Sequence, residues 1–336
     1  MRKAHKEVLD TVSPPKSVDP FTLLPRELSR AVLDYLSFRQ RMNACLVSKG
    51  WAHYIRSTPE LWSHLDLTDV RSNKKVPTSF ISRAINTGRS RLRKASLNRL
   101  YDFEKTLTAL VKQCPLEELM LLDCGMQGSK LSEILRAAKH LKAFQLDRGT
   151  SMAAWDFSRV LDGISDRIET LSLNVDRMVS LDFAFPKLTR FDAKVGGNAL
   201  ALLQAVPDFF PAISSLTIHQ DGLTRGDWVS NPIYRIELDK CKQLSRLDLI
   251  VPTCDGDTLT LPQSLVSLRL SPLFTHRRNQ PYRCLWEAQT LDLPKLEELA
   301  LSAEVEGWEI ALFNILDSRR SVGHTYYQRC RGTQLI

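Results

Sequence analysis

The positions of the hydrophobic residues divide the chain into two parts. Between residues 21 and 67, three short segments carry apolar residues at the three-to-four-residue spacing of amphipathic helices. From residue 62 onwards a different pattern recurs, with apolar residues at the first, fourth and sixth positions. The interval of two between the last pair is typical of a strand with one buried side. The chain is therefore predicted to hold a small helical module followed by α/β repeats.

Each segment of the helical module has a start or stop signal and an apolar face. Pro25 suits the first turn of a helix because its fixed φ is already helical and its missing N–H is not needed there. Ser37 and Ser48 are placed to cap the second and third helices, and Pro59 ends the third. The residues predicted to face inward are Leu28, Val32, Tyr35 and Leu36 in the first helix, Met42, Cys45 and Leu46 in the second (roughly 38–46), and Trp51 and Ile55 in the third.

This spacing resembles the F-box. The anchor residues that carry the resemblance are Leu24-Pro25-x-Glu27-Leu28, Tyr35-Leu36, Val47-Ser48-Lys49-x-Trp51 and Leu61-Trp62. In that family the unit binds the adaptor Skp1 and so joins the protein to a cullin–RING ubiquitin ligase. The resemblance implies that seven residues bind Skp1: Leu24, Pro25, Leu28, Val32, Leu36, Val47 and Trp51. Of these, Val47 and Trp51 would be shared between the interface and the core of the module.

Two observations qualify this interpretation. Gly50 stands where a better helix former is usual, which softens the third helix by about 1 kcal/mol. The three helices also suit a simpler role, because a solenoid needs a cap at its terminal repeat. The sequence leaves that alternative open.

The repeated pattern predicts a leucine-rich-repeat solenoid in the shape of an irregular arc. The copies after the first start 20 to 31 residues apart, within or near the period of leucine-rich repeats. Proline precedes five of the starts, where it would end the preceding helix or loop. The copies start at Trp62, Leu92, Leu116, Leu141, Ile168, Leu188, Ile213, Leu244, Leu265 and Leu296. Helices are predicted between them at 105–113, 130–138, 157–164, 200–206 and 310–316.

The residues that alternate with the leucines are expected to line the concave face. Five cationic and five acidic residues occupy these positions from Leu92 onwards. Such a mixed surface favours selective protein recognition, whereas a surface that follows phosphates should carry one sign. The predicted target-binding residues are Glu118, Arg190, Asp192, Lys194, Arg246, Asp248 and Arg269. A merely soluble inner face, with the ligand on an edge or loop, is the alternative.

The net charge of +8 over 336 residues is concentrated in one segment. Residues 71–105 contain ten Lys and Arg but only two acidic residues. This segment is typical of a solvated face of the first repeats. Alternatively, the protein is a scaffold without a ligase role, and the segment contacts chromatin or nucleic acid. The basic patch expected to make such contact is Arg89, Arg91, Arg93 and Lys94.

Composition and motifs give no sign of catalysis. The seven cysteines are scattered without a C-x-x-C pair, which favours a reducing, intracellular compartment. No phosphate-binding glycine loop and no zinc-binding H-E-x-x-H motif is present. No apolar run approaches the ~18 residues of a membrane span. We therefore expect a non-catalytic, soluble protein with no cofactor and no metal.

The predicted organisation has four parts. Residues 1–19 form a helix tail and a proline-rich linker, 20–67 the F-box, 68–318 the repeats and 319–336 a basic tail. The module is also similar to fungal F-box/leucine-rich-repeat adaptors in which tetratricopeptide repeats precede the F-box. That resemblance implies that this chain is a shortened relative of those adaptors or lacks its front part. It also favours a nuclear location. The expected partners are Skp1, through it cullin and RING subunits, and a target protein.

Overall fold

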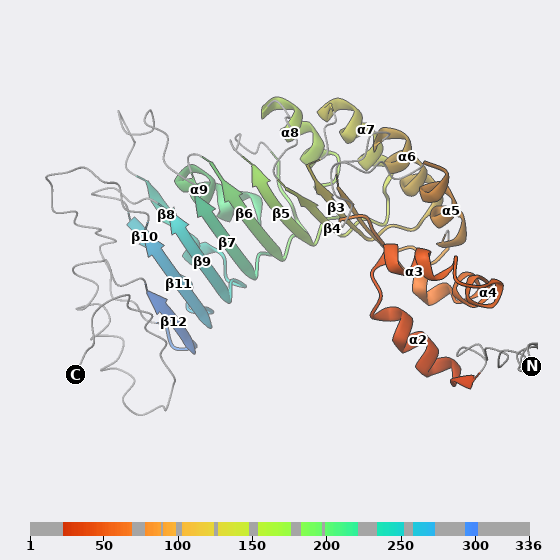
Figure 1. Cartoon of the computed structure of the whole chain (residues 1–336). Helices are drawn as coiled ribbons and strands as arrows, with labels where there is room; N and C mark the ends of the chain where they lie inside the picture. The colour runs from red at the N-terminus through yellow and green to blue at the C-terminus, as the bar shows by residue number, and fades with distance from the viewer. Residues whose placement is uncertain are drawn as a thin grey trace, which may run out of the picture.

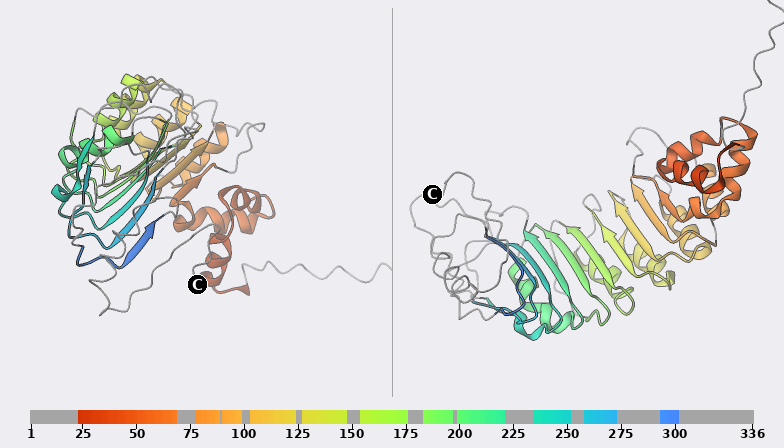
Figure 2. Two further views of the ribbon diagram at one scale, coloured as in Figure 1. Left: turned by 90° about the vertical axis from the view of Figure 1, so that its left-hand side faces the viewer. Right: turned by 90° about the horizontal axis from the view of Figure 1, so that it is seen from below.

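The computed structural model describes residues 23–68, 78–88, 90–98, 103–123, 127–147, 154–175, 183–196, 199–220, 234–251, 258–272 and 293–301. Its main feature is a sheet of ten parallel strands that follow one another in chain order. The strands line the inner side of an arc and the helices lie along its outer side (Figures 1 and 2). A helical module occupies the end of the arc next to the first strand (Figure 1).

The sheet consists of β1 (His64–Asp66), β2 (Lys94–Asn98), β3 (Glu118–Leu122), β4 (Ala143–Leu146), β5 (Thr170–Val175), β6 (Arg190–Val195), β7 (Ser215–Gln220), β9 (Arg246–Val251), β11 (Ser267–Pro272) and β12 (Glu298–Leu301). Each strand begins two residues after one of the ten predicted repeat starts. The predicted strand positions are therefore confirmed throughout the sheet.

The outer layer begins with α5 (Thr78–Gly88), which the sequence pattern did not predict. It continues with α6 (Phe103–Gln113), α7 (Gly128–Ala137), α8 (Ala154–Asp162) and α9 (Ala199–Phe209), which overlap four of the predicted helices. The fifth predicted helix, at 310–316, lies outside the described residues. Between β7 and β11 the chain adds two short parallel strands, β8 (Arg235–Glu237) and β10 (Thr258–Thr260), and the turn η2 (Leu238–Lys240).

A repeated backbone hydrogen bond holds the strands in register. The carbonyl of the second residue of each repeat accepts the N–H groups of the second and third residues of the next repeat. At the first junction, Ser63 accepts from Arg93 and Lys94 at 2.9 and 3.1 Å, and at the last, Val266 accepts from Glu297 and Glu298 at 2.8 and 3.0 Å. The same pair occurs at every junction of the ten-stranded sheet. Successive repeats are thereby stacked with the same residues facing the same side.

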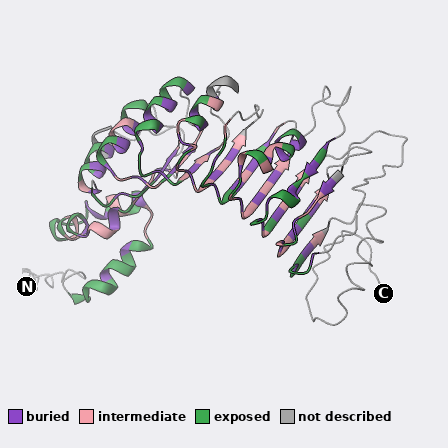
Figure 3. Ribbon diagram, turned by 180° about the vertical axis from the view of Figure 1, so that it is seen from behind, coloured by how far each residue is buried: buried purple, intermediate pink, exposed green. Residues whose placement is uncertain are grey.

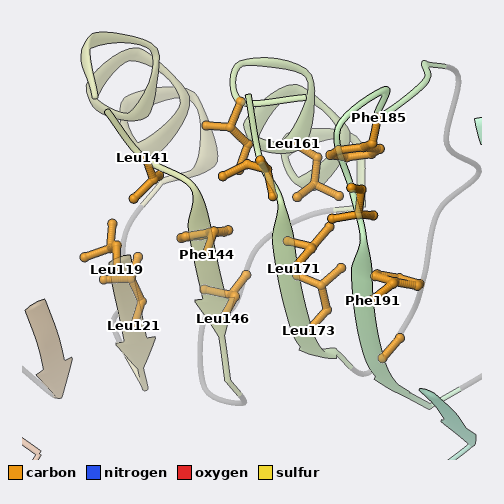
Figure 4. Close-up of a cluster of buried hydrophobic side chains, with 14 of the residues drawn as sticks. Leu119, Leu121, Leu141, Phe144, Leu146, Leu161, Leu171, Leu173, Phe185 and Phe191 are labelled. Atoms are coloured by element: carbon orange, nitrogen blue, oxygen red, sulfur yellow. The ribbon is translucent and has the colours of Figure 1, made fainter. Parts of the chain in front are cut away.

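The side of the sheet that faces the helices is the core. Alternate strand residues such as Leu121, Phe144 and Leu171 are buried there against helix residues such as Leu161 (Figure 4). Each such side chain contributes roughly 1.5–3 kcal/mol by leaving water. The other strand residues, on the opposite side, are half-buried or exposed, apart from Ser96 of β2, which is buried (Figure 3). We call this side the open face, because no described helix covers it.

The helical module consists of α2 (Arg26–Asp34), α3 (Phe38–Ala44) and α4 (Lys49–Ser57), followed by the turn η1 (Pro59–Trp62). It shares one continuous core with the sheet. Trp62 is buried at the junction, where its indole N–H donates to the Ile55 carbonyl at 2.9 Å and its ring packs edge-on against Phe38. The Arg41 guanidinium donates to the Leu61 carbonyl. The module and the first strand are therefore fixed to one another.

A substitution at Gly88, the last residue of α5, tests how tightly this junction is packed. A Cβ atom there would lie 3.0 Å from the Trp62 carbonyl oxygen and 3.2 Å from Trp62 Cβ. We expect Gly88→Ala to lower the free energy of unfolding by about 1–3 kcal/mol, measured by urea denaturation, because backbone atoms have to shift.

Gly163→Ala is the matched control. Its new Cβ would meet mainly the exposed side chain of Arg136, whose Cγ lies at 3.0 Å and which can move aside. Equal stability of the two variants would contradict tight packing at the junction.

Candidate functional site

Helix α2 presents three different faces. Ser29 and Leu33 are buried against the rest of the module. Arg30 and Asp34, one turn apart, form an exposed ion pair at 3.5 Å. The third face carries Leu28 and Val32 and is apolar, yet it lies in solvent.

The exposed apolar side chains extend beyond α2. Among the described residues, the large hydrophobic side chains that are exposed all lie in the helical module, with exposures of 40 to 91 %. We call this set the apolar patch: Leu23, Leu24, Leu28, Val32, Tyr35, Leu46 and Val47. An apolar cluster left in water typically marks a binding surface.

Three sequence predictions about this module are wrong. Leu28, Val32 and Tyr35 were expected on a buried helix face, but they are exposed. Leu46 was expected to face inward, but it is 84 % exposed. Val47 was expected to be shared between the interface and the core of the module, but it is 66 % exposed and does not belong to the core. Periodicity establishes that residues share a face, but it does not identify what covers that face. Here no described part of the chain covers it.

The local structure of the module otherwise follows the sequence. The Ser37 hydroxyl accepts from the Gln40 N–H at 3.3 Å, and the Gln40 side chain accepts from the Ser37 N–H at 2.8 Å. The Ser48 hydroxyl accepts from the Trp51 N–H at 3.0 Å. Both predicted caps are therefore confirmed, and the capped helices fix the positions of the patch residues that flank them.

The predicted Skp1-binding residues divide into three groups. Leu24, Leu28, Val32 and Val47 belong to the apolar patch. Leu36 and Trp51 are half-buried and pack against the core, so each also supports the module. Pro25, which is exposed, precedes α2, and its carbonyl accepts the first helical hydrogen bond from the Ser29 N–H at 3.0 Å.

The open face of the sheet is the second candidate surface. All seven predicted target-binding residues lie on it, in strands β3, β6, β9 and β11, and the register arranges them in rows across the strands. The row of first residues runs through Arg190, Ser215, Arg246, Ser267 and Glu298. Neighbouring strands are about 4.8 Å apart, so charges in one row have a defined spacing.

Several charges on the open face neutralise one another. Lys94 Nζ lies 2.7 Å from Glu118 Oε1, and Arg269 Nη1 lies 3.8 Å from Asp248 Oδ2. His219 Nε2 lies 3.3 Å from Asp248 Oδ1, within ion-pair distance but without hydrogen-bond geometry.

Other charges on this face are not neutralised in this way. Arg190, Asp192 and Arg246 form no ion pair with any described residue. Their charges are therefore not neutralised within the described part of the chain.

A groove of about 630 Å³ crosses strands β7, β9, β11 and β12. The open-face residues that line it include Ser215, Thr217, Arg246, Asp248, Arg269 and Glu298. Three of these, Arg246, Asp248 and Arg269, are among the predicted target-binding residues, but the sequence pattern does not predict a depression. A depression depends on how short and long side chains alternate along a row, and that becomes visible only once the register is known.

The basic patch is only partly described. Arg89 lies outside the described residues, and Arg91 is exposed. Arg93 pairs with Glu117 at 3.2 Å and Lys94 with Glu118 at 2.7 Å, so acidic residues of the next repeat offset two of its cations. This pairing weakens the attraction that the patch would exert on phosphates.

The described residues offer little for catalysis or metal binding. None of them form a group of three or more His, Cys, Asp or Glu that could hold a metal ion. Burial raises the pKa of the Cys45 thiol and raises that of Cys241 to about 11, which disfavours the nucleophilic thiolate. Among the helices described, none is long and apolar enough to cross a membrane.

Comparison with known proteins identifies the helical module. Residues 21–68 match the F-box-like family. No curated protein matches the chain. The match supports the resemblance found in the sequence, and an F-box domain suggests a role in substrate recognition by SCF ubiquitin ligases, with Skp1 as the typical partner.

Two neighbouring residues of α2 test whether the patch is exposed in the isolated protein. Val32 is 52 % exposed and Leu33 is fully buried. We expect Leu33→Ala to lower the free energy of unfolding by about 3 kcal/mol, and Val32→Ala to change it by less than about 0.5 kcal/mol, measured by urea denaturation of the chain alone. A comparable loss in both variants would mean that the patch is covered within the chain.

Proposed function

We propose that this protein is a substrate-recognition subunit of an SCF ubiquitin ligase. The F-box-like domain docks on Skp1, and the open face of the sheet holds the target. The observation that carries the proposal is the apolar patch, whose seven side chains are all exposed to solvent within the F-box-like domain. A patch of this kind is stable in a soluble protein when a partner covers it.

The second half of the proposal is that the repeats are leucine-rich repeats that bind the target. Support comes from the strand that begins two residues after each repeat start and from the helices on the outer side of the arc. The mixed charges of the open face suit recognition of a protein surface. We place the target contacts at the seven predicted residues, with Arg190, Asp192 and Arg246 as the residues whose charges are not already neutralised.

In this proposal the protein performs no chemistry itself. It raises the effective concentration of the target's lysines near the ubiquitin-loaded enzyme. The shared core at Trp62 supports this role, because a fixed junction holds the two binding surfaces at a constant separation. A chromatin-associated scaffold is the less supported alternative, since Arg93 and Lys94 are paired with glutamates. The nuclear location and the similarity to fungal adaptors stay predictions.

Co-purification with Skp1 tests the docking half. We expect Val32→Asp to reduce Skp1 binding at least about tenfold, because a charge replaces an apolar contact in the patch. Arg30→Asp is the control, since it introduces the same residue on the exposed charged face of the same helix.

Three results would contradict the proposal. These are a wild-type chain that does not bind Skp1, a Val32→Asp variant that binds as well as the wild type, and equal losses in the two variants.

A further inference from the structure

Within the groove on the open face, opposite charges lie on β9 and on β12, and we call these two positions its charged ends. Arg246 on β9 and Glu298 on β12 occupy the same row of the sheet, with Ser267 of β11 between them. Two strand spacings therefore separate them, which is about 10 Å between their Cα atoms. Both are exposed and both line the groove.

Neither charge is neutralised by the described part of the chain. Arg246 and Glu298 form ion pairs neither with one another nor with any other described residue. The ends are reinforced by like charges, since Arg190 lies two strands from Arg246 in the same row and Glu297 precedes Glu298. Along this row the groove is thus cationic at β9 and anionic at β12.

The middle of the groove is close to neutral and has room for side chains. Arg269 and Asp248 lie there and pair with one another at 3.8 Å. Ser267, which lies between Arg246 and Glu298 in the row, is too short to fill the space between the charged ends. A bound segment would meet open space in the centre and one uncompensated charge at each end.

We propose that this groove binds an extended segment of the target protein that carries an acidic and a basic residue three positions apart. In a polyproline II segment, residues i and i+3 lie on the same side and about 9.3 Å apart. That spacing matches the two ends of the groove, so an acidic side chain reaches Arg246 while a basic one reaches Glu298. The inference rests on the proposed function, because it specifies the target class of the same open face.

Three fluorescein-labelled, proline-flanked nonapeptides test this inference by fluorescence anisotropy at low ionic strength, with the full chain. They carry Asp-x-x-Arg, Asp-x-x-Asp or Arg-x-x-Arg at their centre. The wild type should bind the mixed peptide up to about fivefold more tightly than either like-charged peptide, because an exposed ion pair contributes at most about that factor.

Reversing one end should change the preference in a defined direction. Glu298→Arg makes both ends cationic and should favour the Asp-x-x-Asp peptide, whereas Arg246→Glu makes both ends anionic and should favour Arg-x-x-Arg. Lys94→Glu is the matched control, because it makes the same kind of charge reversal on the same face but outside the groove, and it should leave the preference unchanged.

The inference is overturned if the wild type binds none of the peptides or does not discriminate between them. It is also overturned if the preference does not follow the reversals, or if Lys94→Glu shifts it as much as the variants in the groove. Skp1 binding, measured on the same protein samples, separates this failure from failure of the proposed function. Normal Skp1 binding without peptide selectivity would contradict only the proposed peptide specificity of the groove and would leave the proposed docking on Skp1 intact.

Discussion

The repeated backbone hydrogen bond at the start of each strand is the constraint on which the rest of the structure depends. One carbonyl of each repeat accepts two N–H groups of the next, from Ser63 at the first junction to Val266 at the last. This contact fixes the register, and the register places every leucine of the pattern on the helix side. A slip of one residue would turn those leucines towards solvent and the charged residues into the core.

The same constraint produces the two surfaces. Because the helices cover one side of the sheet, the residues that alternate with the leucines form straight rows on the other side. The first repeat has no earlier repeat to stack on, and the F-box-like domain takes that place through Trp62 and Leu65. The domain buries one side against the sheet and leaves Leu28 and Val32 in solvent. The apolar surface and the polar surface thus belong to one rigid unit but suit different partners.

Much of this architecture could be predicted from the sequence, because it depends on local periodicity. The strand positions and the caps at Ser37 and Ser48 follow from patterns within a few residues. Periodicity alone could not predict the exposure of Leu46 and of the apolar face of α2, since exposure depends on what packs against the module from elsewhere in the chain. The F-box resemblance did imply that Leu28 and Val32 face a partner. The groove and the pairing of Lys94 with Glu118 depend on which residues become neighbours across strands. Which charges are neutralised by a neighbouring strand therefore becomes clear only once the strand register is known.

The central claim is that two separate surfaces serve two partners, with Skp1 at the apolar patch. Hydrogen–deuterium exchange of the full chain with and without Skp1 tests it most directly. The account predicts slower exchange of amides in residues 23–57 and unchanged exchange in strands β6, β7, β9 and β11. Protection of those strands by Skp1, or no protection of α2 and α3, would contradict it.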